Sequence, residues 1–135
     1  MFSFHQTTPD FKAEAVNAAR RGQHVMLTTA TSSGKSLCFL IPTLEAILCN
    51  HEATAILLFP TKALAHDQFR VLKNIQGSGY LGDDVRSCVV DGDTLQSARS
   101  EAQSRANIIL TNPDLIHASM IPHHHAWRRV IANIK

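Results

Sequence analysis

One segment of the sequence combines the residue types that bind a phosphate group. It reads TATSSGKS and lies between a short apolar run and a stretch with helical spacing. At such a junction, backbone N–H groups and the positive end of the helix face the same point, which favours an anion. Gly34 lets the backbone approach phosphate oxygens, Lys35 reaches the β- and γ-phosphates, and Ser36 completes a magnesium shell. The segment therefore predicts a phosphate-binding loop.

The elements that position this loop alternate between short apolar runs and longer segments with a 3.6-residue period. Nearly continuous apolar strands followed by helices indicate an α/β fold, in which a parallel sheet is covered on both faces. Pro113 stands at the first position of a further helix. The expected strands are 24–29, 54–60, 85–92 and 107–112, and the expected helices are 37–48, 63–76 and 94–105.

Two of these helices have an apolar face that we expect to be buried. In the first, the face consists of Leu37, Leu40, Ile41, Leu44, Ile47 and Leu48; in the second, it consists of Ala65, Phe69, Leu72 and Ile75.

Composition narrows the class of protein. The chain has 135 residues, 44% of them hydrophobic, which suits one soluble domain and leaves little room for two. Its net charge of +2 gives no general field for polyanions, so any nucleic-acid contact must be local. No apolar stretch reaches the length of a membrane span and the N-terminus does not resemble a signal peptide, which predicts an intracellular protein. Cys38, Cys49 and Cys88 are expected to be reduced, buried thiols.

Three blocks in this order carry a resemblance to a known family. The loop TATSSGKS, the block PTKALAHDQ at 60–68 and the block TNPD at 111–114 each follow an expected strand. Together they resemble the DEAD/DEAH-box helicases of superfamily 2. With DGDT at 91–94, the chain looks more narrowly like the ATP-dependent DNA-repair helicases whose full proteins carry a C-terminal cysteine-rich metal-binding domain.

The resemblance implies a three-layer, parallel-sheet RecA-like P-loop NTPase domain, here truncated before the Walker B strand. It implies ATP and Mg²⁺ as cofactors, with Lys35 and Ser36 as catalytic residues and Ser36 as the magnesium ligand through ATP. The nucleotide contacts would be Gln6, Thr29, Ala30, Thr31, Ser32, Ser33, Gly34, Lys35 and Ser36.

The same resemblance implies contacts with the sugar-phosphate backbone of single-stranded or partly duplex DNA, fit for movement along any sequence. The residues would be Pro60, Thr61, Lys62, Ala63, Asp91, Gly92, Thr111 and Asn112. It also implies a second RecA-like lobe in the parent protein, 3′-to-5′ movement in DNA repair, and no membrane partner. Localisation would be nuclear in a eukaryote, and in the cytoplasm or nucleoid of a bacterium.

The N-terminal part departs from the family pattern. Phe4-His5-Gln6 looks like the segment whose glutamine reads the adenine edge, but TTPDFK at 7–12 separates it from the helix that normally follows. We therefore divide the chain into an N-terminal segment, 1–12, and a partial helicase ATP-binding domain, 13–135. Ser32 stands where many relatives have glycine.

The C-terminal part departs further. The strand that bears the acidic Asp-Glu pair in the family would follow Lys135, and those carboxylates hold magnesium and position the attacking water. We expect the parent protein to be an ATP-dependent DNA helicase, whereas the 135-residue chain alone would hydrolyse ATP little or not at all. The alternatives are a truncated, non-catalytic nucleotide- or DNA-binding chain, and a P-loop kinase or NTPase.

Other residues have ordinary structural interpretations beside functional ones. His123, His124 and His125 suggest a metal site, but no second ligand group has the usual spacing, so a polar helix start before Trp127 is favoured. Asp91 and Asp93 flank a glycine and are more typical of a turn than of a catalytic pair. We expect Arg20-Arg21 and Arg128-Arg129 to be solvated helix ends, and Trp127, Val130, Ile131 and Ile134 to pack on the sheet.

Overall fold

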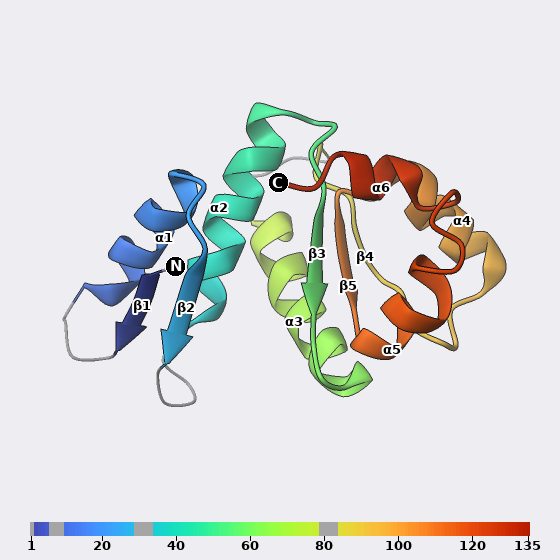
Figure 1. Cartoon of the computed structure of the whole chain (residues 1–135), viewed down its shortest axis with the longest axis horizontal. Coiled ribbons are helices and arrows are strands. Elements are labelled where there is room, and N and C mark those ends of the chain that lie inside the picture. Colours follow the sequence, from blue (N-terminus) through green and yellow to red (C-terminus); the bar gives the residue numbers. More distant parts are fainter. Residues whose placement is uncertain (1, 6–9, 29–33, 79–83) are drawn as a thin grey trace. The chain divides into compact units, whose positions relative to one another are not determined.

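A computed structural model of the chain describes residues 2–5, 10–28, 34–78 and 84–135. These residues form two compact units, Met1–Glu45 and Ala46–Lys135, which are taken in turn. Strands and helices alternate along the chain, as the sequence predicts (Figure 1). No helix among the described residues is long and apolar enough to cross a membrane.

The first unit contains a small parallel sheet. Strand β1 (Phe2–His5) pairs with β2 (Val25–Thr28), and helix α1 (Phe11–Arg20) connects them. Helix α2 (Ser36–Cys49) begins in this unit, directly after the phosphate-binding loop. Its core consists of the buried residues Phe11, Ala15 and Cys38, with the partly buried Val25 and Leu27 packed against them.

The second unit contains a three-stranded sheet. In chain order its elements are β3 (Ala55–Leu58), α3 (Lys62–Gly77), β4 (Ser87–Val89), α4 (Gln96–Arg105) and β5 (Ile108–Thr111). All three strands are parallel and lie in the order β3-β5-β4, so β5 is central and is buried along its whole length. Figure 1 shows α3 on one face of this sheet and α4 on the other.

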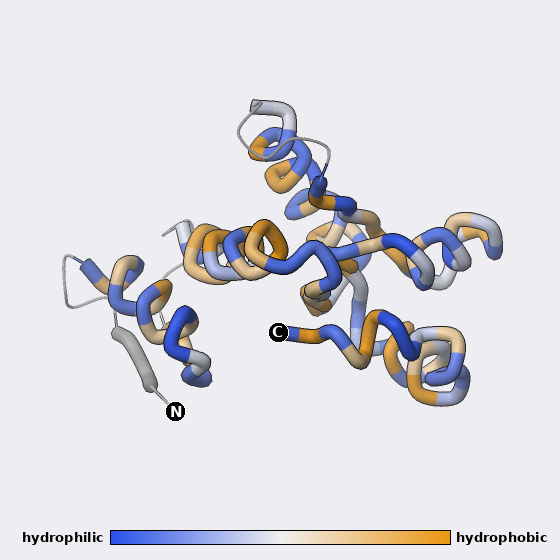
Figure 2. The backbone as a smooth tube through the Cα atoms, turned by 90° about the horizontal axis from the view of Figure 1, so that it is seen from above, coloured by the Kyte–Doolittle hydropathy of each residue, from blue (hydrophilic) through white to orange (hydrophobic). Residues whose placement is uncertain are grey.

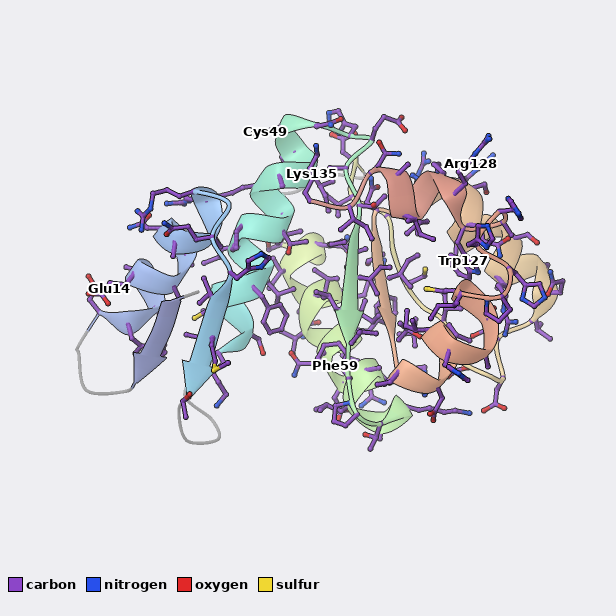
Figure 3. The ribbon with its side chains drawn as sticks, in the orientation of Figure 1. Glu14, Cys49, Phe59, Trp127, Arg128 and Lys135 are labelled. Atoms are coloured by element: carbon purple, nitrogen blue, oxygen red, sulfur yellow. The ribbon has the colours of Figure 1, made fainter. Side chains whose placement is uncertain are left out.

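The residues after β5 complete the second core. A short helix α5 (Pro113–Leu115) continues into the π-helical turn η2 (Ile116–Met120), and helix α6 (Arg128–Ala132) follows. Trp127 is fully buried among these C-terminal segments (Figure 3). It belongs to a core cluster with Val90, Ala102, Ala106, Ile109, Leu115, Met120 and Val130.

The C-terminal residues lie beside the start of β3. Ile134 forms an isolated parallel bridge with Thr54, whose N–H donates to Asn133 O at 2.9 Å and whose carbonyl accepts from Lys135 N–H at 3.2 Å. The next residue, Ala55, directs its own N–H to β5 through Asn107 O. Because backbone groups alternate along a strand, Ile134 lies at the edge of β3 opposite β5.

Several predictions from the sequence need correction. Phe2–His5 is a strand that the periodicity did not indicate; it pairs with β2, and β3, β5 and β4 form the other parallel sheet among the described residues. Apolar residues on the flank of the first predicted helix face stay exposed, because the packed surface covers a narrower arc than the apolar stripe, and so do two of the C-terminal residues expected to pack on the sheet. These residues are Leu37, Ile41 and Leu48 on α2, and Ile131 and Ile134 near the C-terminus. Figure 2 shows apolar and polar residues around the helices of both units.

Cys49 and Arg129 also differ from expectation, whereas Arg20, Arg21 and Arg128 are exposed as predicted. All three cysteines are free thiols, but Cys49, the last residue of α2, is exposed, whereas Cys38 is buried. Arg20 pairs with Glu45 at 2.5 Å. Arg129 donates to Gln103 O at 3.1 Å and to Ala106 O, so it satisfies the carbonyls that end α4 rather than lying free in solvent.

Candidate functional site

The predicted nucleic-acid contacts of the second unit follow three neighbouring parallel strands. Residues 60–63 follow β3, residues 91–94 follow β4, and residues 111–112 lie at the end of β5. Carboxyl ends of parallel strands meet at one edge of a sheet, which is the usual ligand-binding edge of an α/β fold. The strand order places 111–112 between the other two segments. The structure therefore brings to one edge residues that are up to 52 positions apart in sequence.

The segment after β3 is exposed and ends in a capped helix. Thr61 is the N-cap of α3, and its hydroxyl oxygen accepts a hydrogen bond from Leu64 N–H at 3.3 Å. Pro60, Lys62 and Ala63 are exposed beside it. Lys62 forms an ion pair with Asp93 from the segment after β4, and this hydrogen bond raises the pKa of Lys62.

The segment after β4 is a turn organised by Asp91. The residue is 8% exposed, and its Oδ1 accepts from Asp93 N–H at 2.9 Å and from the Thr94 hydroxyl at 3.1 Å. Its Oδ2 lies 3.5 Å from Nε2 of His66 on α3. The DGDT segment is thus the turn that the sequence indicates, with Gly92 exposed at its tip.

The electrostatics of Asp91 follow from these partners. Burial alone raises the pKa of this carboxyl, but the hydrogen bonds from Asp93 N–H, Thr94 and His66, together with the charge of Lys62, outweigh burial and lower it. Asp91 is therefore a charged, internally bonded group that shapes the turn. Its side chain is committed to the protein rather than presented to a ligand.

The end of β5 provides a second helix cap. Asn112 Oδ1 accepts from Leu115 N–H at 2.9 Å, and Pro113 begins α5. The preceding residue, Thr111, is 1% exposed, and its hydroxyl has no hydrogen-bond partner among the described residues. Asn112 thus caps α5 and also lies at the edge of the sheet where the carboxyl ends of the three strands meet.

The phosphate-binding loop belongs to the first unit. Thr29–Ser33 and Gln6 lie outside the described residues, so their predicted contacts stay predictions. Gly34 has a φ of +74°, a conformation that glycine adopts at least cost. Lys35 and Ser36 follow it at the start of α2, so the positive end of the helix dipole lies beside the loop. These residue types and this backbone fit a nucleotide phosphate.

Two residues that the sequence analysis did not single out contribute to these sites. A Cβ on Gly34 would lie 2.9 Å from Nζ of Lys12, so α1 brings a second cation to the phosphate-binding loop. Nothing in the local sequence pattern indicates this contact, because it depends on how α1 packs. His66 could have been found, because it stands four residues after Lys62 and therefore shares its face of α3.

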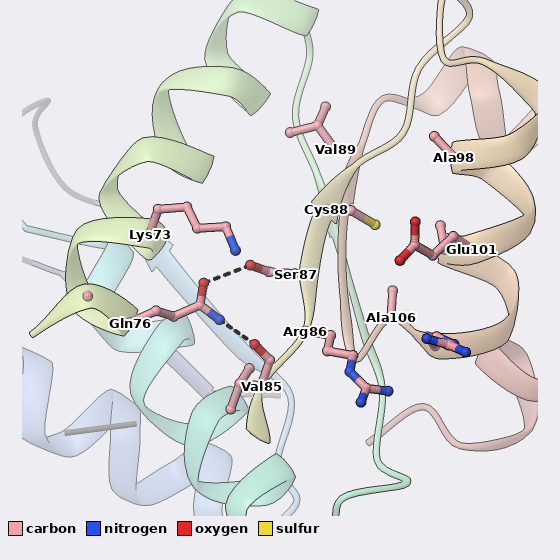
Figure 4. A pocket seen from close by; sticks show the side chains of 13 residues that line it. Lys73, Gln76, Val85, Arg86, Ser87, Cys88, Val89, Ala98, Glu101 and Ala106 are labelled. Atoms are coloured by element: carbon pink, nitrogen blue, oxygen red, sulfur yellow. Dashed lines mark hydrogen bonds between the residues drawn. The ribbon is translucent and has the colours of Figure 1, made fainter. Parts of the chain in front are cut away.

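A cavity in the second unit is lined by other residues (Figure 4). It has a volume of about 580 Å³ between α3, α4 and the outer edge of β4. Gln76 lines its α3 side, where it accepts from the Ser87 hydroxyl at 2.9 Å and donates to Val85 O at 2.7 Å. None of the predicted site residues lines it. Among the described residues, His123–His125 included, no cluster of His, Cys, Asp or Glu is placed to hold a metal ion.

Comparison with known proteins identifies the family. The profile of the DEAD/DEAH box helicases matches residues 9–135, which is nearly the whole chain. The chain belongs to the DEAD/DEAH box helicase family.

Similar helicases occur in fungi and bacteria. The ATP-dependent helicase HRQ1 of Saccharomyces cerevisiae is 38% identical over 134 residues, covering 97% of this chain and 12% of its own length. The ATP-dependent helicase YprA of Bacillus subtilis is 37% identical over 121 residues, covering 90% of this chain and 16% of its own length. This DEAD/DEAH-box chain therefore spans less than a fifth of these relatives.

A solved helicase structure has the same fold. Crystal structures of the DUF1998 helicase MrfA, bound to DNA alone and to DNA with AMPPNP, match with a TM-score of 0.85 and 36% identity. Each match covers 92% of this chain and 17% of MrfA. The α/β, RecA-like helicase fold expected from the sequence is confirmed, and ATP use is a property of the family.

Proposed function

We propose that this chain supplies the nucleotide-binding loop and the first nucleic-acid-gripping loops of an ATP-dependent DNA helicase. The observation that supports it most directly is the meeting of the segments after β3, β4 and β5 at one sheet edge, with Lys62 exposed there. Backbone phosphates bind to lysine side chains and to helix N-termini without regard to sequence. The complex of MrfA with DNA and AMPPNP supports both ligands for a protein of this fold.

In this proposal each described residue has a defined task. Lys35 binds the β- and γ-phosphates of ATP, and Ser36 provides a hydroxyl to Mg²⁺. Bound ATP supplies the free energy of phosphoanhydride hydrolysis for movement along the strand. Lys62 neutralises one phosphate of the DNA backbone. Thr61 and Asn112 cap the N-termini of α3 and α5, which lie at the edge of the sheet where the DNA strand would bind. Asp91 keeps the neighbouring turn in place.

The nucleic-acid part is tested with a fluorescent single-stranded oligothymidine and anisotropy over a series of salt concentrations. Lys62→Ala should weaken binding and lower the slope of log affinity against log salt by about 0.7, the value for one phosphate on a single strand. Lys73→Ala is the matched control, because it removes the same charge from the other end of α3. Equal effects of the two substitutions would contradict a specific role for Lys62.

The nucleotide part is tested with a fluorescent ATP analogue in the presence of Mg²⁺. Lys35→Ala should abolish measurable binding, because the ammonium group offsets the charge of the β- and γ-phosphates. Lys135→Ala serves as the control for loss of one positive charge. Binding by Lys35→Ala at the affinity of the unaltered chain would contradict the assignment of the loop.

A further inference from the structure

The ion pair between Lys62 and Asp93 crosses the end of the central strand. Lys62 begins α3 after β3, and Asp93 lies in the turn after β4. Both strands pair with β5, one on each side, so they lie about 10 Å apart. The two side chains therefore meet above the carboxyl end of β5, where Asn112 and Thr111 lie.

The turn holds Asp93 in this position. Its N–H donates to the buried Asp91, while Asp91 N–H donates to the Thr94 hydroxyl at 2.8 Å and Arg99 donates to Asp91 O at 3.1 Å. The Asp93 side chain is nevertheless 83% exposed, with its carboxylate directed to Lys62. The turn that carries Asp93 is fixed by several hydrogen bonds. Within the described part of the chain, its carboxylate is paired only with the exposed Lys62, so another anion could take its place at that lysine.

We infer that Asp93 competes with the backbone phosphate of a bound single strand for Lys62, and so limits how tightly the strand is held. This inference rests on the proposed function of Lys62. A carboxylate and a phosphodiester are both anionic acceptors for an ammonium group, so only one of them occupies the direct contact. When a phosphate takes this contact, Asp93 loses its partner, and the loss of that ion pair subtracts from the affinity for the strand. When the DNA strand leaves, Asp93 pairs with Lys62 again. Re-forming this ion pair favours release of the DNA at each step of movement.

The experiment measures affinity for a fluorescent oligothymidine of about 20 nucleotides, a length that exceeds common single-strand site sizes. Four forms of the chain are compared: unaltered, Asp93→Asn, Lys62→Ala, and the double variant. Asp93→Asn retains the backbone N–H that bonds Asp91, so the turn persists. It should tighten binding about two- to fivefold, the range for release of one exposed ion pair. The double variant should bind as Lys62→Ala does.

Asp67→Asn is the matched control, because it removes an exposed carboxylate that is also paired with a cation, Arg70, at 3.0 Å. Tightening by Asp93→Asn alone, lost in the Lys62→Ala background, supports the competition. Equal tightening by Asp67→Asn, or tightening that persists without Lys62, would mean a general charge effect and overturn it. Weaker binding by Lys62→Ala with no change in Asp93→Asn would overturn the role of Asp93 while sparing the proposed function. No binding by any form would overturn both.

Discussion

In both units the candidate binding loop lies between a parallel strand and a helix, but the packing that holds the loop in place differs between the two units. In each, the loop follows the carboxyl end of a parallel strand and leads into a helix. The second unit surrounds a fully buried strand with helices on both faces, and its loops are joined by an ion pair and a bonded turn. The first unit has a two-stranded sheet and a small core around Phe11. A binding edge made of several loops thus depends on a continuous core, whereas a single loop depends chiefly on local backbone geometry.

The largest expected effect is the loss of stability when Trp127 is truncated, which tests whether the binding edge of the second unit depends on its core. This side chain is fully buried in the core of the second unit. Trp127→Ala should lower the free energy of unfolding by about 3–5 kcal/mol, because it leaves a large cavity. Hydrogen exchange followed by mass spectrometry should show most of the lost protection in peptides from 46–135, with less change in peptides from 1–45.

Two further variants control this prediction. Trp127→Phe should cost less than the alanine change, because Nε1 of the indole has no hydrogen-bond partner among the described residues. Ile131→Ala, on the exposed side of α6, should change stability by no more than about 0.5 kcal/mol. Equal loss of protection in both units after Trp127→Ala would mean that the two cores do not behave differently.

A smaller effect is expected at the turn that joins the loops of the second unit. Asp91→Ala removes an acceptor that bonds Asp93 N–H and the Thr94 hydroxyl. Because a buried charged acceptor is lost, the free energy of unfolding should fall by about 1–3 kcal/mol, as measured by urea denaturation at neutral pH. Asp114→Asn, an exposed aspartate at the start of α5, should leave stability nearly unchanged.

The same turn gives this prediction a pH dependence. The pKa of Asp91 is lower in the folded chain than its ordinary value, so the carboxylate contributes stability above the unfolded-state pKa of about 3.9. That contribution decreases as the pH falls through the lower, folded-state pKa. The difference between the unaltered chain and Asp91→Ala should therefore be constant near neutrality and shrink below about pH 4. A difference that grows on acidification would contradict the assigned direction.

Local patterns predicted much of this architecture. The helix at 63–76 and the strand at 107–112 were placed within two residues of α3 and β5, because the 3.6-residue period and the flanking Asn-Pro step are local signals. The Asp-Gly-Asp turn was predicted for the same reason. The order and spacing of three short sequence blocks were enough to predict the family, and the match to the DEAD/DEAH box helicase profile confirms it.

The rest depends on tertiary packing. Arg129 could have been a solvated helix end by sequence, but it bonds the last carbonyls of α4 because α6 packs against that helix. The pairing of Lys62 with Asp93 needs the strand order β3-β5-β4, which periodicity does not specify. The alternation of Phe2 and Phe4 is typical of a strand, yet a segment of four residues carries too little signal to be assigned without its partner β2.

The smallest expected effect addresses the first unit through its two left-handed glycines. Gly22 and Gly34 have φ values of +71° and +74°, so alanine at either position is strained to a similar extent, about 1–2 kcal/mol. Their surroundings differ: a Cβ at 22 meets nothing within 4 Å, whereas a Cβ at 34 lies 2.9 Å from Nζ of Lys12. The lysine end is flexible and moves at little cost, so Gly22→Ala and Gly34→Ala should lower stability by similar amounts. Only Gly34→Ala should weaken binding of a fluorescent ATP analogue, because it displaces backbone and cation at the phosphate loop. Equal loss of nucleotide binding in both variants would show that the effect comes from general destabilisation of the first unit rather than from the geometry of its loop.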